Sequence, residues 1–319
     1  MRSKLLLSGL LLPSVLTISF VAGCGSAASM DDLPVVDPNQ LVPSADAVQR
    51  AKVIVDARPY DSKIPASYDA KKSWPLVILL HGYGANGLAQ NLYFGIGQEV
   101  DRLGFLYAYP DGTTDSKGKR FWNATDVCCD FDKKNIDDVA YVDAIIDDMA
   151  SQYHVDKKRI FIVGHSNGGF MSHRYACDRA ERVAAIVPLA GDNFKDAQNR
   201  CHPKEPVAVL QVHGDKDDAV PYTGGTDPDT GRTIPSALDS VKFWASVAGC
   251  SMTADTSAEN LDVDVNIDGK ETTVTRFPHC KPGGAAELWT IKGGSHVPAF
   301  GRPDWANYVW SWFAAHPKP

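Results

Sequence analysis

Nearly continuous apolar runs of strand length alternate with helical patterns along most of this chain. The runs occupy residues 75–80, 160–163, 183–187, 206–212 and 287–291. Runs of this length with few polar positions are typical of strands buried on both faces of a parallel sheet. The stretches between them carry apolar residues at helical spacing, as at 139–149 and 238–248. The pattern therefore predicts an α/β fold, with a mostly parallel sheet and helices on both faces.

Two C-terminal segments show different patterns. Residues 251–282 depart from the α/β rhythm: apolar positions alternate from Val263 to Ile267, and Asp268-Gly269 suits a tight turn, so we expect a small hairpin there. The last segment instead carries a stripe of apolar residues at helical spacing, which predicts core packing rather than a ligand site. The members of the stripe are Trp305, Tyr308, Val309, Trp312 and Phe313.

The apolar run at 160–163 leads directly into Gly164-His165-Ser166-Asn167-Gly168, and a helical pattern follows. In that context G-x-S-x-G is typical of a nucleophile elbow, a strained turn that raises the serine hydroxyl above the edge of the sheet. The two glycines leave room for the turn. Ser166 is therefore the candidate nucleophile, and His165 beside it is a candidate substrate contact.

A nucleophilic serine needs a base and an acid that orients the base, and in α/β-hydrolases these follow in the order Ser, Asp or Glu, His. The run at 206–212 ends in a segment with three aspartates, of which we assign Asp217 as the acid in preference to Asp215 and Asp218. His296 follows the run at 287–291 through a glycine-rich exit and is the candidate base. All of these residues lie where strands end, which is the edge where open α/β sheets bind ligands.

The run at 75–80 continues into His81-Gly82-Tyr83-Gly84. Backbone N–H groups from such a loop and from the residue after the nucleophile can hold the negative oxygen of a tetrahedral intermediate. We assign the amides of Tyr83 and Asn167 to this oxyanion hole, and His81 to substrate binding. The irregular loop at 111–137 contains Trp122, which is interpreted either as a wall of the acyl or alcohol site or as a packing residue.

These motifs together resemble the secreted esterases grouped with polyhydroxybutyrate depolymerases and feruloyl esterases. The similarity runs from about Arg58 to the C-terminus. It is carried by Leu80-His81-Gly82-Tyr83-Gly84, Tyr109-Pro110-Asp111-Gly112, Phe121-Trp122-Asn123-Ala124, Val163-Gly164-His165-Ser166-Asn167-Gly168-Gly169, His213-Gly214 with Asp217, and Gly293-Gly294-Ser295-His296.

The resemblance implies a single α/β-hydrolase domain without a cofactor, and it places Asp217 at the family's catalytic acid. It favours feruloyl esterase or polyhydroxybutyrate depolymerase activity, on substrates that include polymeric esters. Removal of acetyl groups from plant polysaccharide stays open, as do peptidase and acyltransferase chemistry, because fold and triad do not choose the acceptor. The alternative from another class is a surface binding protein on a hydrolase scaffold.

The N-terminus has the pattern of an export signal. Arg2 and Lys4 precede an apolar stretch at 5–20, and Val21-Ala22-Gly23-Cys24 resembles the lipobox of bacterial lipoproteins. This pattern predicts a lipoprotein signal peptide at 1–23, lipidation of Cys24, a flexible tether at 24–48 and a catalytic domain at 49–319. The product would be lipid-anchored at the cell envelope or secreted. An uncleaved membrane anchor is the alternative.

Six cysteines remain after Cys24, an even number that favours disulfides in an exported protein. Locality suggests Cys177 with Cys201 and Cys250 with Cys280, which leaves Cys128 with Cys129. We expect no metal, and we interpret the faintly calcium-loop-like segment 227–231 as a turn. The net charge of −7 argues against nucleic-acid binding, and we expect a monomer.

Overall fold

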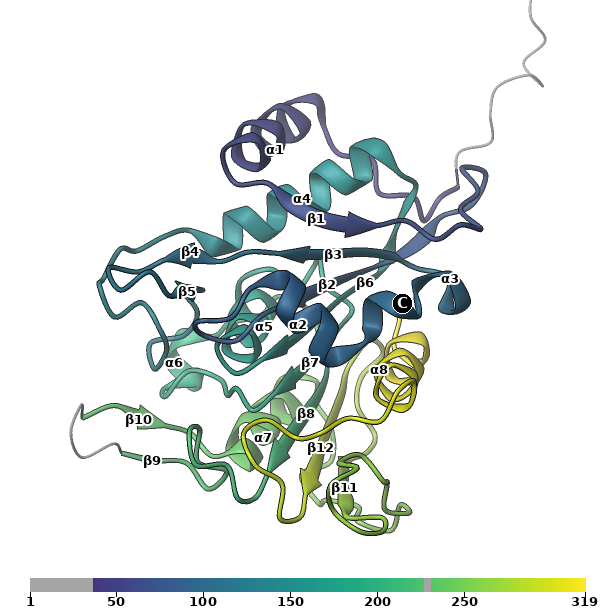
Figure 1. Ribbon diagram of the computed structural model, residues 1–319. Coiled ribbons are helices and arrows are strands. Elements are labelled where there is room, and N and C mark those ends of the chain that lie inside the picture. The colour runs from purple at the N-terminus through teal and green to yellow at the C-terminus, as the bar shows by residue number, and fades with distance from the viewer. Residues whose placement is uncertain (1–36, 227–230) are drawn as a thin grey trace, which may run out of the picture. The chain divides into compact units, whose positions relative to one another are not determined.

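The computed structural model describes residues 37–226 and 231–319. Its central element is an eight-stranded sheet in the order β1-β3-β2-β6-β7-β8-β12-β11 (Figure 1). Strands β3 to β12 in that order are mutually parallel, and the edge strands β1 and β11 pair antiparallel, which confirms the mostly parallel sheet. The bounds are β1 Tyr60–Lys63, β2 Trp74–Leu80, β3 Leu106–Pro110, β6 Val155–His165, β7 Ala185–Leu189, β8 Ala208–Gly214, β11 Thr272–Phe277 and β12 Ala285–Ile291.

Helices cover both faces of this sheet, as predicted. Alternate residues of β6 show the division, because Ile160 and Ile162 belong to one apolar cluster while Phe161 and Val163 belong to another. The helices over the first cluster are α1 (Ala45–Ala57), α4 (Asp138–Gln152), α5 (Asn167–Asp178) and α7 (Ala237–Val247). Those over the second are α2 (Gly87–Phe94), the 3-10 helix η2 (Ile96–Gln98), α3 (Val100–Leu103) and α8 (Asp304–Ala315).

The remaining elements are short. They are α6 (Ala197–Arg200) and two pairs of two-residue strands, β4 (Thr113–Thr114) with β5 (Arg120–Phe121) and β9 (Gly225–Thr226) with β10 (Thr233–Ile234). The C-terminal stripe packs in the core as expected: Phe313 of α8 stacks on Phe161 of β6 with ring centroids 4.7 Å apart. Across residues 37–226 and 231–319, no helix has the length and apolar character to span a bilayer.

The folded domain begins earlier than the predicted boundary at residue 49. The Leu41 amide donates to the Val155 carbonyl at 2.8 Å, and the Ser44 side chain caps α1 by accepting the Ala47 amide. Ala51 and Val55 of α1 are buried in the core. Residues 37–48 therefore belong to the domain rather than to a tether. Residues 1–36, which carry the predicted signal peptide and Cys24, lie outside the described residues.

The hairpin predicted within 251–282 forms only its second strand. Thr272–Phe277 is β11, but it pairs with β12 rather than with the segment before it. That segment makes only isolated bridges, such as Leu261 with Thr272. The Glu271 carboxylate accepts the amides of Val263 and Asp264, both at 3.0 Å, and Asp264 also bridges to Phe300, so this part of the chain does not pair with β11.

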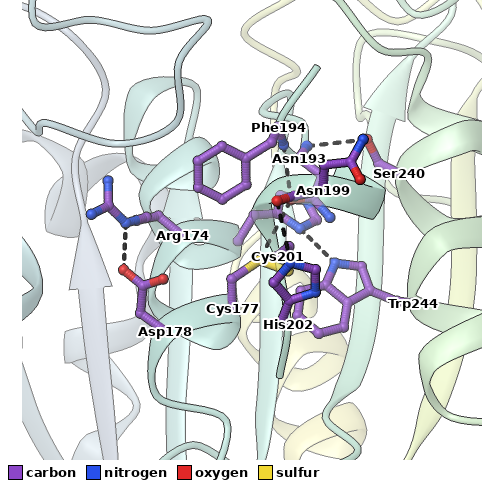
Figure 2. Close-up of a disulfide and its surroundings, with 11 residues drawn as sticks. Arg174, Cys177, Asp178, Asn193, Phe194, Asn199, Cys201, His202, Ser240 and Trp244 are labelled. Atoms are coloured by element: carbon purple, nitrogen blue, oxygen red, sulfur yellow. Dashed lines mark hydrogen bonds and ion pairs between the residues drawn. A yellow bond between two sulfur atoms is a disulfide. The ribbon is translucent and has the colours of Figure 1, made fainter. Parts of the chain in front are cut away.

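The described residues contain three disulfides. Two of them are the pairs suggested by locality, and the third joins the two cysteines that were left over. Cys177 of α5 is joined to Cys201, which directly follows α6 (Figure 2). Cys250 after α7 is joined to Cys280 after β11, and Cys128 is joined to its neighbour Cys129. The first two bonds link segments separated by 24 and 30 positions, so they constrain long loops in the unfolded chain.

We predict that replacing both Cys177 and Cys201 by alanine lowers the free energy of unfolding by about 2–4 kcal/mol, because the loop between them is no longer closed in the unfolded state. Urea denaturation followed by circular dichroism measures the change. The same double replacement at Cys128 and Cys129 is the matched control, since adjacent residues close almost no loop. Equal losses for the two pairs would contradict the loop-closure explanation.

Candidate active site

Ser166 occupies a sharp turn between β6 and α5. Its backbone has φ 53° and ψ −118°, a conformation that non-glycine residues rarely adopt. The Ser166 amide donates to the Leu189 carbonyl of β7 at 2.8 Å, which ties the turn to the neighbouring strand. A Cβ at Gly164 would lie 2.2 Å from the Gly168 carbonyl oxygen, and one at Gly168 would lie 2.1 Å from that of Leu80. The turn therefore requires both glycines.

Asp217 and His296 are brought together at the ends of β8 and β12. His296 Nδ1 lies 2.8 Å from Asp217 Oδ2, and the other carboxylate oxygen accepts the amides of Ala219 and Val220. Asp215 is engaged elsewhere, because its carboxylate accepts the Gly293 amide at 2.7 Å. Of the three competing aspartates, Asp217 is thus the one whose carboxylate orients the histidine.

The nucleophile turn lies against the histidine loop through the side chain of His165. Its Nε2 donates to the His296 carbonyl at 2.9 Å, and the two rings lie 5.0 Å apart. The loop after β2 reaches the same point, since a Cβ on Gly82 would lie 3.4 Å from Ser166 Cβ. The structure therefore gathers the serine, the histidine loop and the predicted oxyanion loop at one edge of the sheet.

The two amides assigned to the oxyanion hole belong to the residue after Gly82 and to the residue after Ser166. Asn167 is the first residue of α5, so its N–H has no acceptor within the helix and points out of a positive helix end. Its side chain is turned inward, where it pairs with the backbone N–H and C=O of Trp122 at 2.7 and 3.0 Å. Tyr83 directly follows Gly82, and its hydroxyl is held by Asp115.

His81, which the sequence assigned to substrate binding, and Trp122, for which it left substrate binding or packing open, both lie in the interior of this structure. Both side chains are fully buried. The Trp122 indole donates to the His81 carbonyl at 2.9 Å, and His81 Nε2 accepts the Gly112 amide at 2.8 Å. Burial lowers the pKa of His81 to about 4, which keeps the ring neutral and able to accept. The two residues fasten the loop that starts at Asp111 to the oxyanion loop.

His165 is likewise a packing and positioning side chain in this structure. It is buried, and its protonated Nε2 is used by the His296 carbonyl. Burial lowers the pKa of His165 to about 4, and the nearby His296 acts in the same direction. The ring therefore stays neutral between the nucleophile turn and the histidine loop.

Sequence reasoning missed one neighbour of the acid, His213 at the end of β8. Its Nε2 lies 3.2 Å from Asp217 Oδ2 and 2.9 Å from the Val220 carbonyl oxygen. Burial raises the pKa of the Asp217 carboxyl, but hydrogen bonds from His213 and His296 outweigh it and bring that pKa well below its usual range. The sequence did offer a signal for this contact, because His213 lies four residues before Asp217 at the end of the same strand.

The described residues offer no cluster of three or more histidine, cysteine, aspartate or glutamate side chains arranged to hold a metal ion. Most of the segment interpreted as a turn rather than a calcium loop, residues 227–230, lies outside the described part of the chain.

Comparisons with known proteins agree with this architecture. The chain is 29% identical over 248 residues to feruloyl esterase B of Piromyces equi, across 76% of this chain and 43% of that protein. It is 30% identical over 179 residues to the probable feruloyl esterase C of Aspergillus niger, across 54% of this chain and 60% of that protein. The chain thus spans about half the length of these curated relatives.

Among solved structures, the acetyl xylan esterase from Aspergillus awamori superposes with a TM-score of 0.54 at 13% identity, covering 79% of this chain and 92% of that one. At this identity the likeness concerns the fold, which is that of the α/β-hydrolases. Residues 66–229, just over half of the sequence, match the model of a family described as phospholipase/carboxylesterase. The chain therefore belongs to the phospholipase/carboxylesterase family.

Proposed function

We propose that this protein is a serine esterase that hydrolyses carboxylic esters through an acyl-enzyme. The observation that carries the proposal is the Asp217–His296 pair, held at 2.8 Å beside the strained turn that presents Ser166. A carboxylate on Nδ1 fixes the proton there, so Nε2 of His296 is left free to accept a proton. The family to which the chain belongs supports the same chemistry.

The steps follow from these positions. His296 Nε2 takes the Ser166 proton as Oγ bonds to the ester carbonyl carbon, and the carbonyl oxygen becomes an oxyanion facing the Tyr83 and Asn167 amides. The tetrahedral intermediate then expels the alcohol, which receives the proton from His296. Water attacks the acyl-enzyme with His296 again as the base, and the acid product leaves Ser166 with its hydroxyl restored.

For the substrate, we infer esters of plant cell-wall polysaccharide, with feruloyl groups first and acetyl groups second. Support comes from relatives whose names are feruloyl esterases and, in Neocallimastix patriciarum, a bifunctional acetylxylan esterase/xylanase that is 30% identical over 148 residues. Polyhydroxyalkanoate hydrolysis rests on the sequence resemblance alone. A panel of feruloylated, acetylated and hydroxyalkanoate esters separates these substrates.

Ser166→Ala and His296→Ala should each lower the rate of ester hydrolysis by about 10³- to 10⁶-fold, because each removes a group that acts only in the bond-making steps. Initial rates on p-nitrophenyl acetate measure the loss. Ser295→Ala, at an exposed serine next to the histidine, is the matched control and should keep wild-type turnover.

A fluorophosphonate probe should label the wild type and not Ser166→Ala. Near-normal turnover by Ser166→Ala would contradict the proposed mechanism. A wild type that neither reacts with the probe nor hydrolyses esters would support the binding-protein alternative.

Asp217→Asn should cost far more activity than Asp215→Asn or Asp218→Asn. Only the Asp217 carboxylate lies against His296 Nδ1, and an amide there no longer holds the histidine tautomer firmly. Asp215 instead holds the Gly293 amide, so we expect a smaller loss at that position. Steady-state kcat for the three variants decides the matter, and equal losses at Asp215 and Asp217 would overturn the assignment.

We also propose that the protein is exported and anchored through a lipid on Cys24. The small-small-Cys site after an apolar segment supports this, and three disulfides favour an oxidising compartment. Several acyl chains, each contributing about 0.8 kcal/mol per buried methylene, would hold it stably at a membrane.

Cys24→Ser should block lipid attachment and shift the protein out of the membrane fraction or leave an uncleaved precursor, while esterase activity per folded molecule stays unchanged. Expression in a bacterial host, fractionation and intact mass spectrometry of both proteins provide the measurement. Wild-type protein that is soluble and carries no lipid adduct would replace this proposal with ordinary secretion.

A further inference from the structure

We propose that His213 is a positioning residue for Asp217, and that a directed chain of hydrogen bonds from Trp244 determines which of its ring nitrogens carries the proton. The inference rests on the proposed function, because it assigns a role to the neighbour of the catalytic acid. The chain of contacts runs through the buried space between α5, α7 and β8. Its members, Trp244, His173, Gln211 and His213, are all fully buried.

Trp244 sets the direction of this series of hydrogen bonds. The Trp244 indole nitrogen (Figure 2) lies 2.9 Å from His173 Nδ1, and an indole N–H can only donate. His173 Nδ1 must therefore accept. Burial lowers the pKa of His173 to about 4, so the ring is neutral and its single proton lies on Nε2. That nitrogen donates to Gln211 Oε1 at 2.9 Å.

The Gln211 side-chain amide continues the same order of donor and acceptor toward the active site. Because its oxygen is used by His173, its NH₂ group faces the carbonyl of Gly191 at 3.1 Å, Asp192 Oδ1 at 3.2 Å and His213 Nδ1 at 3.3 Å. Burial lowers the pKa of His213, but the hydrogen bond to Asp217 and the nearby Asp192 outweigh it, so that pKa is raised. In the neutral form of His213, the Nδ1 atom is then the acceptor. The proton of that ring belongs on Nε2.

The opposite side of the His213 ring gives the same answer independently. Nε2 faces two acceptors, Asp217 Oδ2 at 3.2 Å and the Val220 carbonyl at 2.9 Å, so it carries a proton whether the ring is neutral or charged. Asp217 Oδ2 thus receives one imidazole donor from His213 and one from His296. Oδ1 receives two backbone amides. Four donors from fixed positions leave the carboxylate one orientation.

Two further titratable groups face this part of the site. Asp192, which follows β7, places Oδ1 3.9 Å from His213 Nδ1, and burial raises its pKa to about 7 against the opposing pull of His213. On the other side, His165 packs against the His296 ring. Removal of the His213 donor would leave His296 as the one side-chain donor to Asp217 among those described here, so the carboxylate would be held less firmly.

The test compares His213→Phe, which keeps a planar ring without a donor, with His213→Gln, which places an amide N–H near the position of Nε2. We expect His213→Phe to lower kcat on the order of 10- to 100-fold with KM little changed. His213→Gln should recover most of the lost kcat. His202→Phe, at an exposed histidine, is the control.

Wild-type kcat in His213→Phe, or a His213→Gln variant no better than His213→Phe, would overturn the proposal. A second measurement does not depend on turnover or on the folding of those variants. In ¹⁵N-labelled Ser166→Ala protein, NMR should show His173 protonated at Nε2 only, and His213 with a proton on Nε2. A proton on His173 Nδ1, or none on His213 Nε2, would refute the directed chain. Turnover retained by Ser166→Ala would instead refute the proposed function.

Discussion

The close approach of backbones at the nucleophile turn is the constraint on which the rest of the active edge depends. Gly164 and Gly168 lie so near each other and Leu80 that no side chain fits at either position. The same contact places the end of β2 directly against the start of α5, so the position of the oxyanion loop is tied to that of the serine turn. The φ of 53° at Ser166 is tolerated because hydrogen bonding to β7 holds the turn in place.

Much of the fold could be predicted because buried parallel strands leave an unambiguous apolar pattern. The predictions failed where hydrogen bonds, rather than the apolar pattern, determine the structure. Residues 37–48 look like a tether by composition, yet one cap at Ser44 and a backbone bond from Leu41 attach them to the domain. The segment before β11 alternates as a strand would, but the Glu271 carboxylate takes the amides that a strand partner would otherwise bind.

The candidate site shows a similar division. Chain order and strand ends pointed to Ser166, to His296 and to a group of three aspartates, and the resemblance to the esterase family supported Asp217 among them. The fold brings these residues to one edge. Sequence could not tell which polar residues at those ends face the substrate and which face the interior. His81 and Trp122 turned out to fasten two loops together, while His213, at the same kind of position, contacts the acid. That difference depends on side-chain direction, which no spacing in the sequence reports.

Helix α1 has a consequence for any shortened form of this protein. Just after it, the Arg58 guanidinium pairs with Asp138 at 2.6 Å and donates to the Asp111 carbonyl at 2.9 Å. Asp111 begins the loop that Trp122 and His81 fasten beside the oxyanion amides. A protein trimmed to residue 49 would lose the cap of α1 and loosen this attachment. Helix α1 thus supports the catalytic edge through Arg58, the residue that directly follows it, although the helix supplies no catalytic group.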